Sequence, residues 1–419
     1  MKFNKWTLGL AALGVVSLSS AAKAEEKMSA IQSALSATTI SGYVDVSAQW
    51  NIGKQATPGD PGYFPYYSFG GADKADGFNL NVVQLSIAKA LDESEWASGY
   101  RVDLWFGPDA NALASASTFH TSAYELYPDD GASADLGIRQ AYVALRAPVG
   151  NGLDFKLGVF DSILGYESLE SGNNPNHTRS YGFSIEPTTL TGVLASYRFN
   201  DSISVSAGVA NTKGPHINTR AHGEDYMSEA SKTYLGSVAL TAPSDWGWAA
   251  GSTLYAGVIH GMDDNEAGYD YDWKSTSWYF GGTLATPVAG LKVGAAFDLL
   301  DLYDWGNFAG TDGTVWTLGG YASYQASEKL SIHARAEFVE DNTADYIIPN
   351  YQNRDYTRIF ALTGTVQYDL WANVISRLEI RWDHSCSGDI FGKNEYNGEG
   401  YVPSESDAVV IAANVIYKF

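Results

Sequence analysis

Apolar and polar residues alternate along most of this chain, from about residue 38 to the last residue. A period of two indicates β-strands, because successive side chains of a strand point to opposite faces. Helix-period segments are almost absent after about residue 35. Sixteen alternating segments are predicted, at about 38–52, 77–91, 98–107, 135–147, 152–161, 188–200, 201–211, 232–242, 249–262, 274–286, 290–302, 314–325, 328–340, 357–370, 374–384 and 407–419. The sequence therefore predicts an all-β fold.

The connections between these segments alternate between seven short turns and eight long loops. Long loops are uncommon in a compact soluble domain, whereas short turns at one end and long loops at the other are typical of a transmembrane antiparallel β-barrel. A soluble β-sandwich also alternates, but its strands are shorter. The predicted strands are long enough to cross a bilayer with tilt, for which about 9–11 residues suffice. We expect about 16 strands, or 18 if a long loop contains another hairpin.

The start of the chain predicts export. Residues 1–24 have two early lysines, an apolar stretch and a small-x-small end, which is typical of a secretory signal peptide. We expect residues 25–37 to form a periplasmic leader with helical character, before a barrel over 38–419. Removing the signal peptide changes the formal charge from −22 to −25, because it holds three lysines and no acid. Such an acidic exported chain is a poor candidate for binding nucleic acid.

The end of the chain predicts how the barrel closes. Val415, Tyr417 and Phe419 fall on one face of the last strand, which runs to the final residue. A barrel in lipid must pair its last strand with its first. We expect Tyr417 and Phe419 to face lipid within the periplasmic-side aromatic belt, and the barrel as a whole to contact outer-membrane lipid and lipopolysaccharide. Other expected members of this belt are Trp50, Trp105, Tyr368, Trp371 and Trp382. A closing strand that ends in Phe resembles the signal by which the barrel-assembly machinery recognises outer-membrane proteins.

The stretch Leu157–Tyr197 resembles the OmpL-like putative β-barrel porin family. The matching elements are Gly158-Val159-Phe160, Gly165 and Glu167, Asn174-Pro175-Asn176, Arg179-Ser180-Tyr181 and Glu186-Pro187. The resemblance implies a channel in the bacterial outer membrane through which small hydrophilic solutes and ions pass without an energy source. It also makes a homotrimer a candidate assembly. The Pro-Glu-Phe-Gly-Gly motif of general trimeric porins is absent from this chain.

The long segment 162–187 follows the fifth predicted strand, as the constricting loop does in familiar sixteen-stranded porins. We expect it to fold inward and to place Glu167, Glu170, His177 and Arg179 at a pore constriction. Charged rings select ions of opposite sign. Loop carboxylates opposite Arg101, Arg335, Arg377 and Arg381 would create a transverse field and a weak preference for cations. The expected pore-wall residues are Asp45, Arg101, Asp103, His333, Arg335, Glu337, Arg377, Glu379, Arg381 and Asp383.

Three alternatives remain open from the sequence. The wall charges alternate in sign, so they could pair with one another rather than act on solutes. The aromatic loops Tyr63–Phe69 and Tyr269–Trp273 could stack sugars, which would make the barrel a saccharide channel. A barrel with a blocked lumen could act as an adhesin. No nucleophile, metal or phosphate-binding motif indicates an enzyme, a metal or a cofactor.

Overall fold

The structure is a computed structural model of the whole chain. It describes residues 37–53, 65–71, 74–115, 135–221, 230–262, 274–303, 312–343, 346–347, 356–392, 395–396 and 401–419. The expected signal peptide and, apart from Ala37, the expected leader lie outside the described residues.

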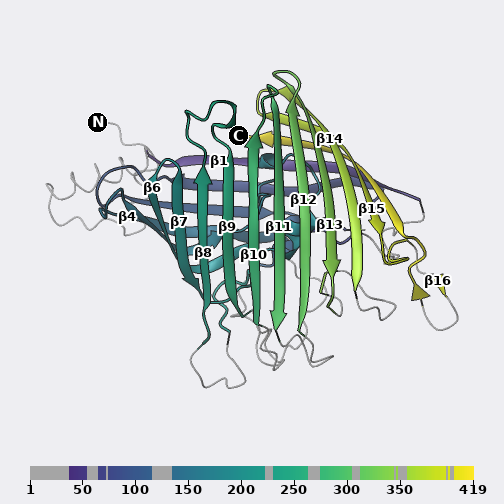
Figure 1. Cartoon of the computed structure of the whole chain (residues 1–419), viewed down its shortest axis with the longest axis horizontal. Helices are drawn as coiled ribbons and strands as arrows, with labels where there is room; N and C mark the ends of the chain where they lie inside the picture. The colour runs from purple at the N-terminus through teal and green to yellow at the C-terminus, as the bar shows by residue number, and fades with distance from the viewer. Residues whose placement is uncertain are drawn as a thin grey trace, which may run out of the picture.

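Sixteen antiparallel strands form one closed barrel (Figure 1). They are β1 (Thr39–Ile52), β2 (Gly77–Lys89), β3 (Ser98–Phe106), β4 (Leu136–Ala147), β5 (Leu153–Asp161), β6 (Thr189–Asn200), β7 (Ile203–Ala210), β8 (Thr233–Thr241), β9 (Thr253–Met262), β10 (Lys274–Ala285), β11 (Leu291–Tyr303), β12 (Gly313–Gln325), β13 (Leu330–Asp341), β14 (Thr357–Trp371), β15 (Val374–Ser385) and β18 (Asp407–Lys418). Each pairs with its neighbours in the chain, and β1 pairs with β18 to close the ring. The predicted fold class and strand count are confirmed.

The other elements among the described residues are short. A two-stranded sheet of β16 (Glu395–Tyr396) and β17 (Tyr401–Val402) lies in the last long connection. The helical turns are α3 (Pro108–Ala112), η3 (Ser171–Asn173), α4 (Tyr181–Ile185) and η4 (Gly247–Ala249). Within the described part of the chain, no helix is both long and apolar enough to cross a membrane. Strand β9 begins four residues later than predicted, because η4 occupies the start of the expected segment.

Closure uses the last residue of the chain. The backbone amide of Phe419 donates to the carbonyl of Gly42 at 3.0 Å, and the amide of Gly42 donates back at 3.0 Å. The side chains of Tyr417 and Phe419 are 49% and 51% exposed on the outer surface. Lys418 bonds to the β14–β15 turn through Asn373, so the chain ends at the mouth formed by the short turns.

The faces of the strands follow the predicted alternation. On β13, Arg335 and Glu337 are buried inside while Ile332 is 46% exposed outside. One belt assignment is wrong: Trp105 is 1% exposed inside the barrel. It shares the inward face of β3 with Asp103, and its ring packs against Phe69 at a centroid distance of 5.7 Å. An aromatic residue is accommodated there because folded-in chain covers this part of the inner wall.

Candidate functional site

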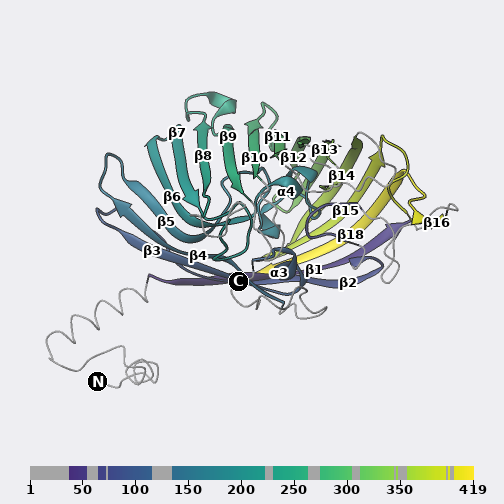
Figure 2. The ribbon, with the colours of Figure 1, turned by 90° about the horizontal axis from the view of Figure 1, so that it is seen from below.

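Residues 162–187, between β5 and β6, lie inside the barrel, and Figure 2 shows α4 within the ring of strands. We call this segment the inward loop. It reaches β13 and β15, which lie far from β5 and β6 in barrel order. The amide of Tyr181 donates to Glu337 on β13 at 2.7 Å, and the amide of Thr178 donates to Glu379 on β15 at 2.9 Å. The inward loop therefore crosses the lumen and is fastened to the far wall.

Local sequence features shape the inward loop. The hydroxyl of Ser180 accepts a hydrogen bond from the amide of Phe183 at 3.0 Å and so caps the start of α4. Gly165 has a φ of +117°, and a Cβ there would overlap the carboxylate of Glu186. Only glycine adopts this backbone conformation without strain. Both features hold the loop in a compact path that fits within the lumen.

A buried ion cluster joins the inward loop to β13. The guanidinium of Arg335 lies 2.8 Å from Glu167 of the loop and 2.6 Å from Glu337 on its own strand. It also donates to the carbonyl of Thr178 at 2.7 Å. A buried ion pair is favourable only when further hydrogen bonds satisfy its remaining donors and acceptors, as they do here. Glu167 is thus a fastening point of the loop.

Two other wall arginines bind the backbone of the inward loop rather than its carboxylates. Arg377 donates to the carbonyl of Asn174 at 2.7 Å, and Arg381 donates to the carbonyl of Arg179 at 2.6 Å. Arg381 also forms an ion pair with Asp383 at 2.8 Å. The expectation that these two arginines face the loop carboxylates is therefore wrong. Both guanidinium groups instead donate to backbone carbonyl oxygens of the inward loop that point toward the wall.

Glu170 occupies a different position, on the side of the loop that faces β3 and β4. Its carboxylate lies 3.0 Å from Arg101 and 2.8 Å from Arg139, and its side chain is 23% exposed. Arg101 also pairs with Asp103 at 2.8 Å. Although burial opposes ionisation, the Arg139 guanidinium and hydrogen bonds from Arg139 and Gln84 hold the pKa of Glu170 below its usual value. Glu170 is therefore ionised at neutral pH.

The other two predicted loop residues point into packed surroundings. The Arg179 guanidinium lies over the rings of Phe69 and Phe183, at 5.7 Å and 5.2 Å from their centroids. The backbone amide of His177 donates to Glu379 at 2.6 Å. Burial lowers the pKa of His177, so its ring is neutral at neutral pH.

The remaining wall predictions divide between packed and open positions. Asp45 is buried and accepts hydrogen bonds from Asn414 at 2.6 Å and Asn81 at 2.8 Å. His333 lies on the inner wall, where its Nδ1 is 2.9 Å from the hydroxyl oxygen of Ser323. Asp45 therefore belongs to an internal network, whereas His333 borders open space.

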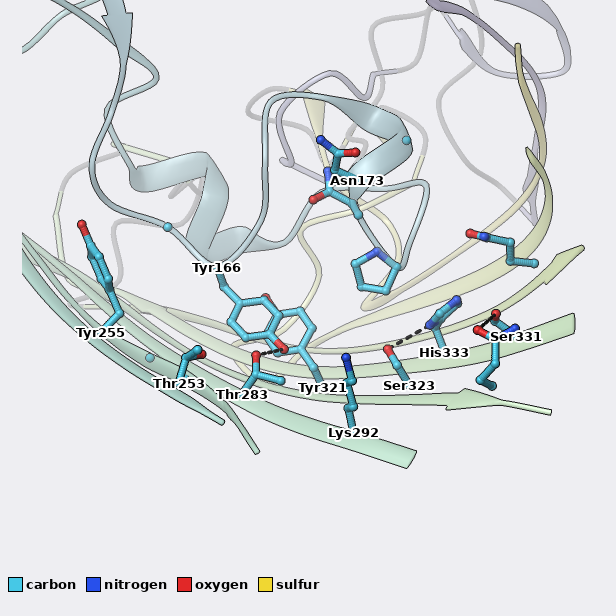
Figure 3. Close-up of a pocket in the computed structure, with 18 of the residues that line it drawn as sticks. Tyr166, Asn173, Thr253, Tyr255, Thr283, Lys292, Tyr321, Ser323, Ser331 and His333 are labelled. Atoms are coloured by element: carbon cyan, nitrogen blue, oxygen red, sulfur yellow. Dashed lines mark hydrogen bonds between the residues drawn. The ribbon is translucent and has the colours of Figure 1, made fainter. Parts of the chain in front are cut away.

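A cavity of about 550 Å³ lies beneath the inward loop, on the side of the short turns (Figure 3). Loop residues form one side, and strands β9–β14 form the other. It is lined by Gly165, Tyr166, Gly172, Asn173, Asn174, Pro175, Thr253, Tyr255, Tyr279, Gly281, Gly282, Thr283, Lys292, Tyr321, Ser323, Gln325, Ser331, His333 and Gln367. We call it the tyrosine cavity.

A second cavity, of about 440 Å³, lies between the inward loop and strands β3–β7. Its charged lining residues are Arg101, Arg139, Lys156, Asp161 and Glu170. Asn173 lines both cavities. We call it the charged cavity. Open space thus lies on two sides of the loop. Tyrosines and neutral polar residues dominate the lining of one cavity, and charged residues are prominent in the other.

Sequence reasoning missed several residues of these cavities. Lys292 and Tyr321 fall on the inward faces of β11 and β12, which the period of two identifies. Lys156 and Arg139 are likewise inward on β5 and β4. Tyr166 lies in the inward loop and could not be assigned to a cavity without the path of the loop.

The two aromatic loops differ in what the structure describes. Tyr269–Trp273 lies outside the described residues. In Tyr63–Phe69, the described part turns into the barrel, where the amide of Ser68 donates to the hydroxyl of Ser184 at 2.8 Å. Phe69 packs against Phe183 of the inward loop. This supports packing among loops as the use of those aromatic residues.

The sequence profile of the family described as "Putative beta-barrel porin-2, OmpL-like" matches residues 37–419. The chain belongs to this family. No curated protein matches this porin. The sixteen-stranded closed barrel and the family match together place it in the bacterial outer membrane.

Solved porin structures share the fold. The anion-selective porin from Comamonas acidovorans is 10% identical, with a TM-score of 0.60, covering 91% of this chain and 99% of that one. Salmonella typhi OmpF in complex with daunomycin is 12% identical, with a TM-score of 0.55 and coverage of 91% and 97%. The trimer form of Vibrio cholerae OmpT is 12% identical, with a TM-score of 0.54 and coverage of 91% and 99%. At these identities the likeness shows the fold alone.

Proposed function

We propose that this porin is a passive diffusion channel for small hydrophilic solutes and ions. A sixteen-stranded barrel is too wide for side chains to fill its interior. The inward loop narrows the lumen, and the tyrosine and charged cavities leave space beside it. The observation that carries the proposal is this pair of largely polar cavities, which share Asn173. Solutes would pass beside the loop rather than through it.

We assign different roles to the expected constriction residues. Glu170 and Arg101 border the charged cavity and form the charged part of the constriction. Glu167, His177 and Arg179 hold the loop in place through buried contacts. The transverse field expected from the sequence would then be confined to the short distance between Glu170 and its arginine partners.

We also propose a weak preference for cations, which arises from the overall negative charge of the chain rather than from the loop carboxylates. The carboxylates of Glu167 and Glu170 are paired with arginines, so little of their charge acts on a passing ion. The formal charge of −25 expected once residues 1–24 are removed nevertheless attracts cations toward the mouths of the barrel. Salt screens such steering over about 10 Å at 0.1 M ionic strength. The preference should therefore be small and should fade as salt rises.

Assembly is the remaining part of the proposal. We infer that the barrel-assembly machinery inserts the chain and that Tyr417 and Phe419 form the recognised end. A homotrimer is the proposed oligomer, by analogy with the trimer form of the OmpT structure. Cross-linking of the detergent-extracted protein tests this directly: a trimer band supports it, and a monomer at all concentrations contradicts it.

Single-channel conductance of refolded protein in a planar bilayer tests the channel itself. Folding is first established by the heat-dependent shift in gel mobility that barrels show. Discrete open steps, with a reversal potential that leans to cations at low salt, are expected. Folded protein that gives no conductance would contradict the diffusion channel and would favour an adhesin with a blocked lumen.

A further inference from the structure

We propose that the tyrosine cavity is a transit subsite for a sugar acid, meaning a single sugar ring that carries one carboxylate. The proposal rests on the proposed diffusion function, because the solute must enter the lumen to reach the cavity. It deepens that function by naming a class of solute.

The charge of the cavity is the first argument. Lys292 is the single lysine or arginine among the lining residues, and no aspartate or glutamate lines the cavity. This is unusual in a chain with 48 acidic and 26 basic residues. Among the described residues, no ion pair engages Lys292, whose side chain is exposed to the lumen. An ammonium group without a carboxylate partner favours a solute that supplies one.

The aromatic rings are the second argument. Tyr166 of the inward loop stacks on Tyr321 of β12, with ring centroids 4.0 Å apart and planes 19° apart. Tyr255 meets Tyr279 edge to face at 5.8 Å. Figure 3 shows Lys292 beside the stacked pair, on the same side of the wall. A tyrosine combines a flat apolar ring with a polar hydroxyl. A sugar ring has the matching combination of apolar C–H faces and hydroxyl edges.

The polar groups and the size of the cavity are the third argument. Hydroxyl and amide side chains form most of the remaining lining, including Thr253, Ser323 and Gln325. The volume of about 550 Å³ falls within the range of about 300–1,000 Å³ typical of small-molecule sites. Many separate donors and acceptors suit a solute with many hydroxyls. An aromatic carboxylate would leave most of them without partners, so we favour the sugar acid.

The rigidity of the cavity is the fourth argument. The loop side is held by Arg377, which donates to the carbonyl of Asn174, and by Lys418, which donates to the carbonyl of Gly172 at 3.1 Å. The hydroxyl of Tyr255 bonds to the carbonyl of Ile163 at the start of the loop. These contacts are present before any solute arrives. Binding therefore needs little ordering of the walls, which preserves affinity for a small solute.

The test is blockade of single-channel current by D-glucuronate, using the refolded mature chain in a planar bilayer. D-Glucose supplies the ring without the charge, acetate supplies the charge without the ring, and benzoate supplies an aromatic acid. We expect glucuronate to block at a concentration about tenfold lower than any of the other three, because only it uses both the lysine and the polar lining. If benzoate blocks at the same concentration as glucuronate, the sugar-acid proposal is overturned and an aromatic acid takes its place.

A matched pair of variants assigns the effect to the cavity. Lys292→Gln should raise the half-blocking concentration of glucuronate about tenfold and leave that of glucose unchanged. Lys156→Gln removes the same charge from the charged cavity and should change neither. Equal effects of the two substitutions would show general electrostatic attraction and overturn the subsite. Tyr321→Leu should weaken both glucuronate and glucose.

Failure of the subsite and failure of the channel give different results. Open channels that glucuronate does not block would overturn the subsite and leave the diffusion function intact. If the folded protein does not conduct, the diffusion function fails, and the subsite is tested by calorimetric titration of glucuronate into folded protein in detergent. Saturable heat that Lys292→Gln abolishes supports the subsite, and absence of heat overturns it.

Discussion

The carboxylate of Glu167 lies 2.8 Å from the guanidinium of Arg335, although the two residues are 168 positions apart in the chain. Their side chains are 1% and 0% exposed, so the pair is shielded from the lumen. It connects the inward loop to the wall opposite the strands from which the loop departs. The position of the inward loop therefore depends on contacts between distant parts of the sequence.

Arg335→Met should release the inward loop. The substitution leaves the buried carboxylates of Glu167 and Glu337 without their cation, a change that costs about 3–5 kcal/mol. We expect larger and noisier single-channel currents and a lower unfolding temperature of the barrel. As a control, Arg146→Met breaks a pair with Asp154 near the short turns, whose side chains are 20% and 33% exposed. A partly exposed pair contributes at most about 1 kcal/mol. Similar currents from both variants would show that Arg335 does not hold the loop.

The barrel itself could be predicted closely, because a strand that faces lipid on one side and a lumen on the other must alternate. That period alone predicts Arg335 and Glu337 on the inner wall, and both lie there. The same period puts Arg101, Asp103 and Trp105 on one face of β3. The wrong prediction of Trp105 in the belt rests on its residue type rather than on its face.

The partners of those inward residues could not be predicted. Alternation predicts that Arg381 faces inward. It does not predict that the guanidinium of Arg381 donates a hydrogen bond to the carbonyl of Arg179 in the inward loop. Such contacts depend on the path of a segment with no period of its own. Lys292 and Tyr321 are inward by pattern, yet their joint use in one cavity depends on where Tyr166 of the loop lies.

Ion preference should respond to Glu170 and hardly to Glu167. Glu170→Gln removes a partly exposed carboxylate and leaves Arg101 and Arg139 less compensated, so the reversal potential in a KCl gradient should move toward anions. Glu167→Gln removes a carboxylate that solvent does not reach, and its direct effect on the potential should be smaller. Arg101→Gln should move the potential the opposite way. A larger shift from Glu167→Gln would place that residue, rather than Glu170, at the constriction.

Channel currents should change in acid. The pKa of Glu170 lies below its usual value in the folded protein. Its ion pairs with Arg101 and Arg139, which also tie the loop to β3 and β4, are thus fully present above the ordinary glutamate pKa of about 4.3 and are lost as pH falls through the lowered value. Currents recorded on stepwise acidification should stay steady down to the ordinary pKa and become noisy below it. Glu170→Gln should remove that step. A step that persists unchanged in this variant would belong to another group.

Assembly should depend on the aromatic end of β18 more than on its neighbours. Phe419 exchanges two backbone hydrogen bonds with Gly42, and its ring is half exposed on the outer face. Phe419→Ala keeps the backbone bonds and removes the aromatic group, so the finished barrel should conduct normally while its assembly in cells slows several-fold. Pulse-chase measurement of heat-modifiable protein in the outer membrane follows this rate. Val415→Ala, on the same outer face of β18, is the control and should assemble at the normal rate. If both variants assemble equally fast while the barrel remains stable, Phe419 closes the barrel but does not serve as the recognised end.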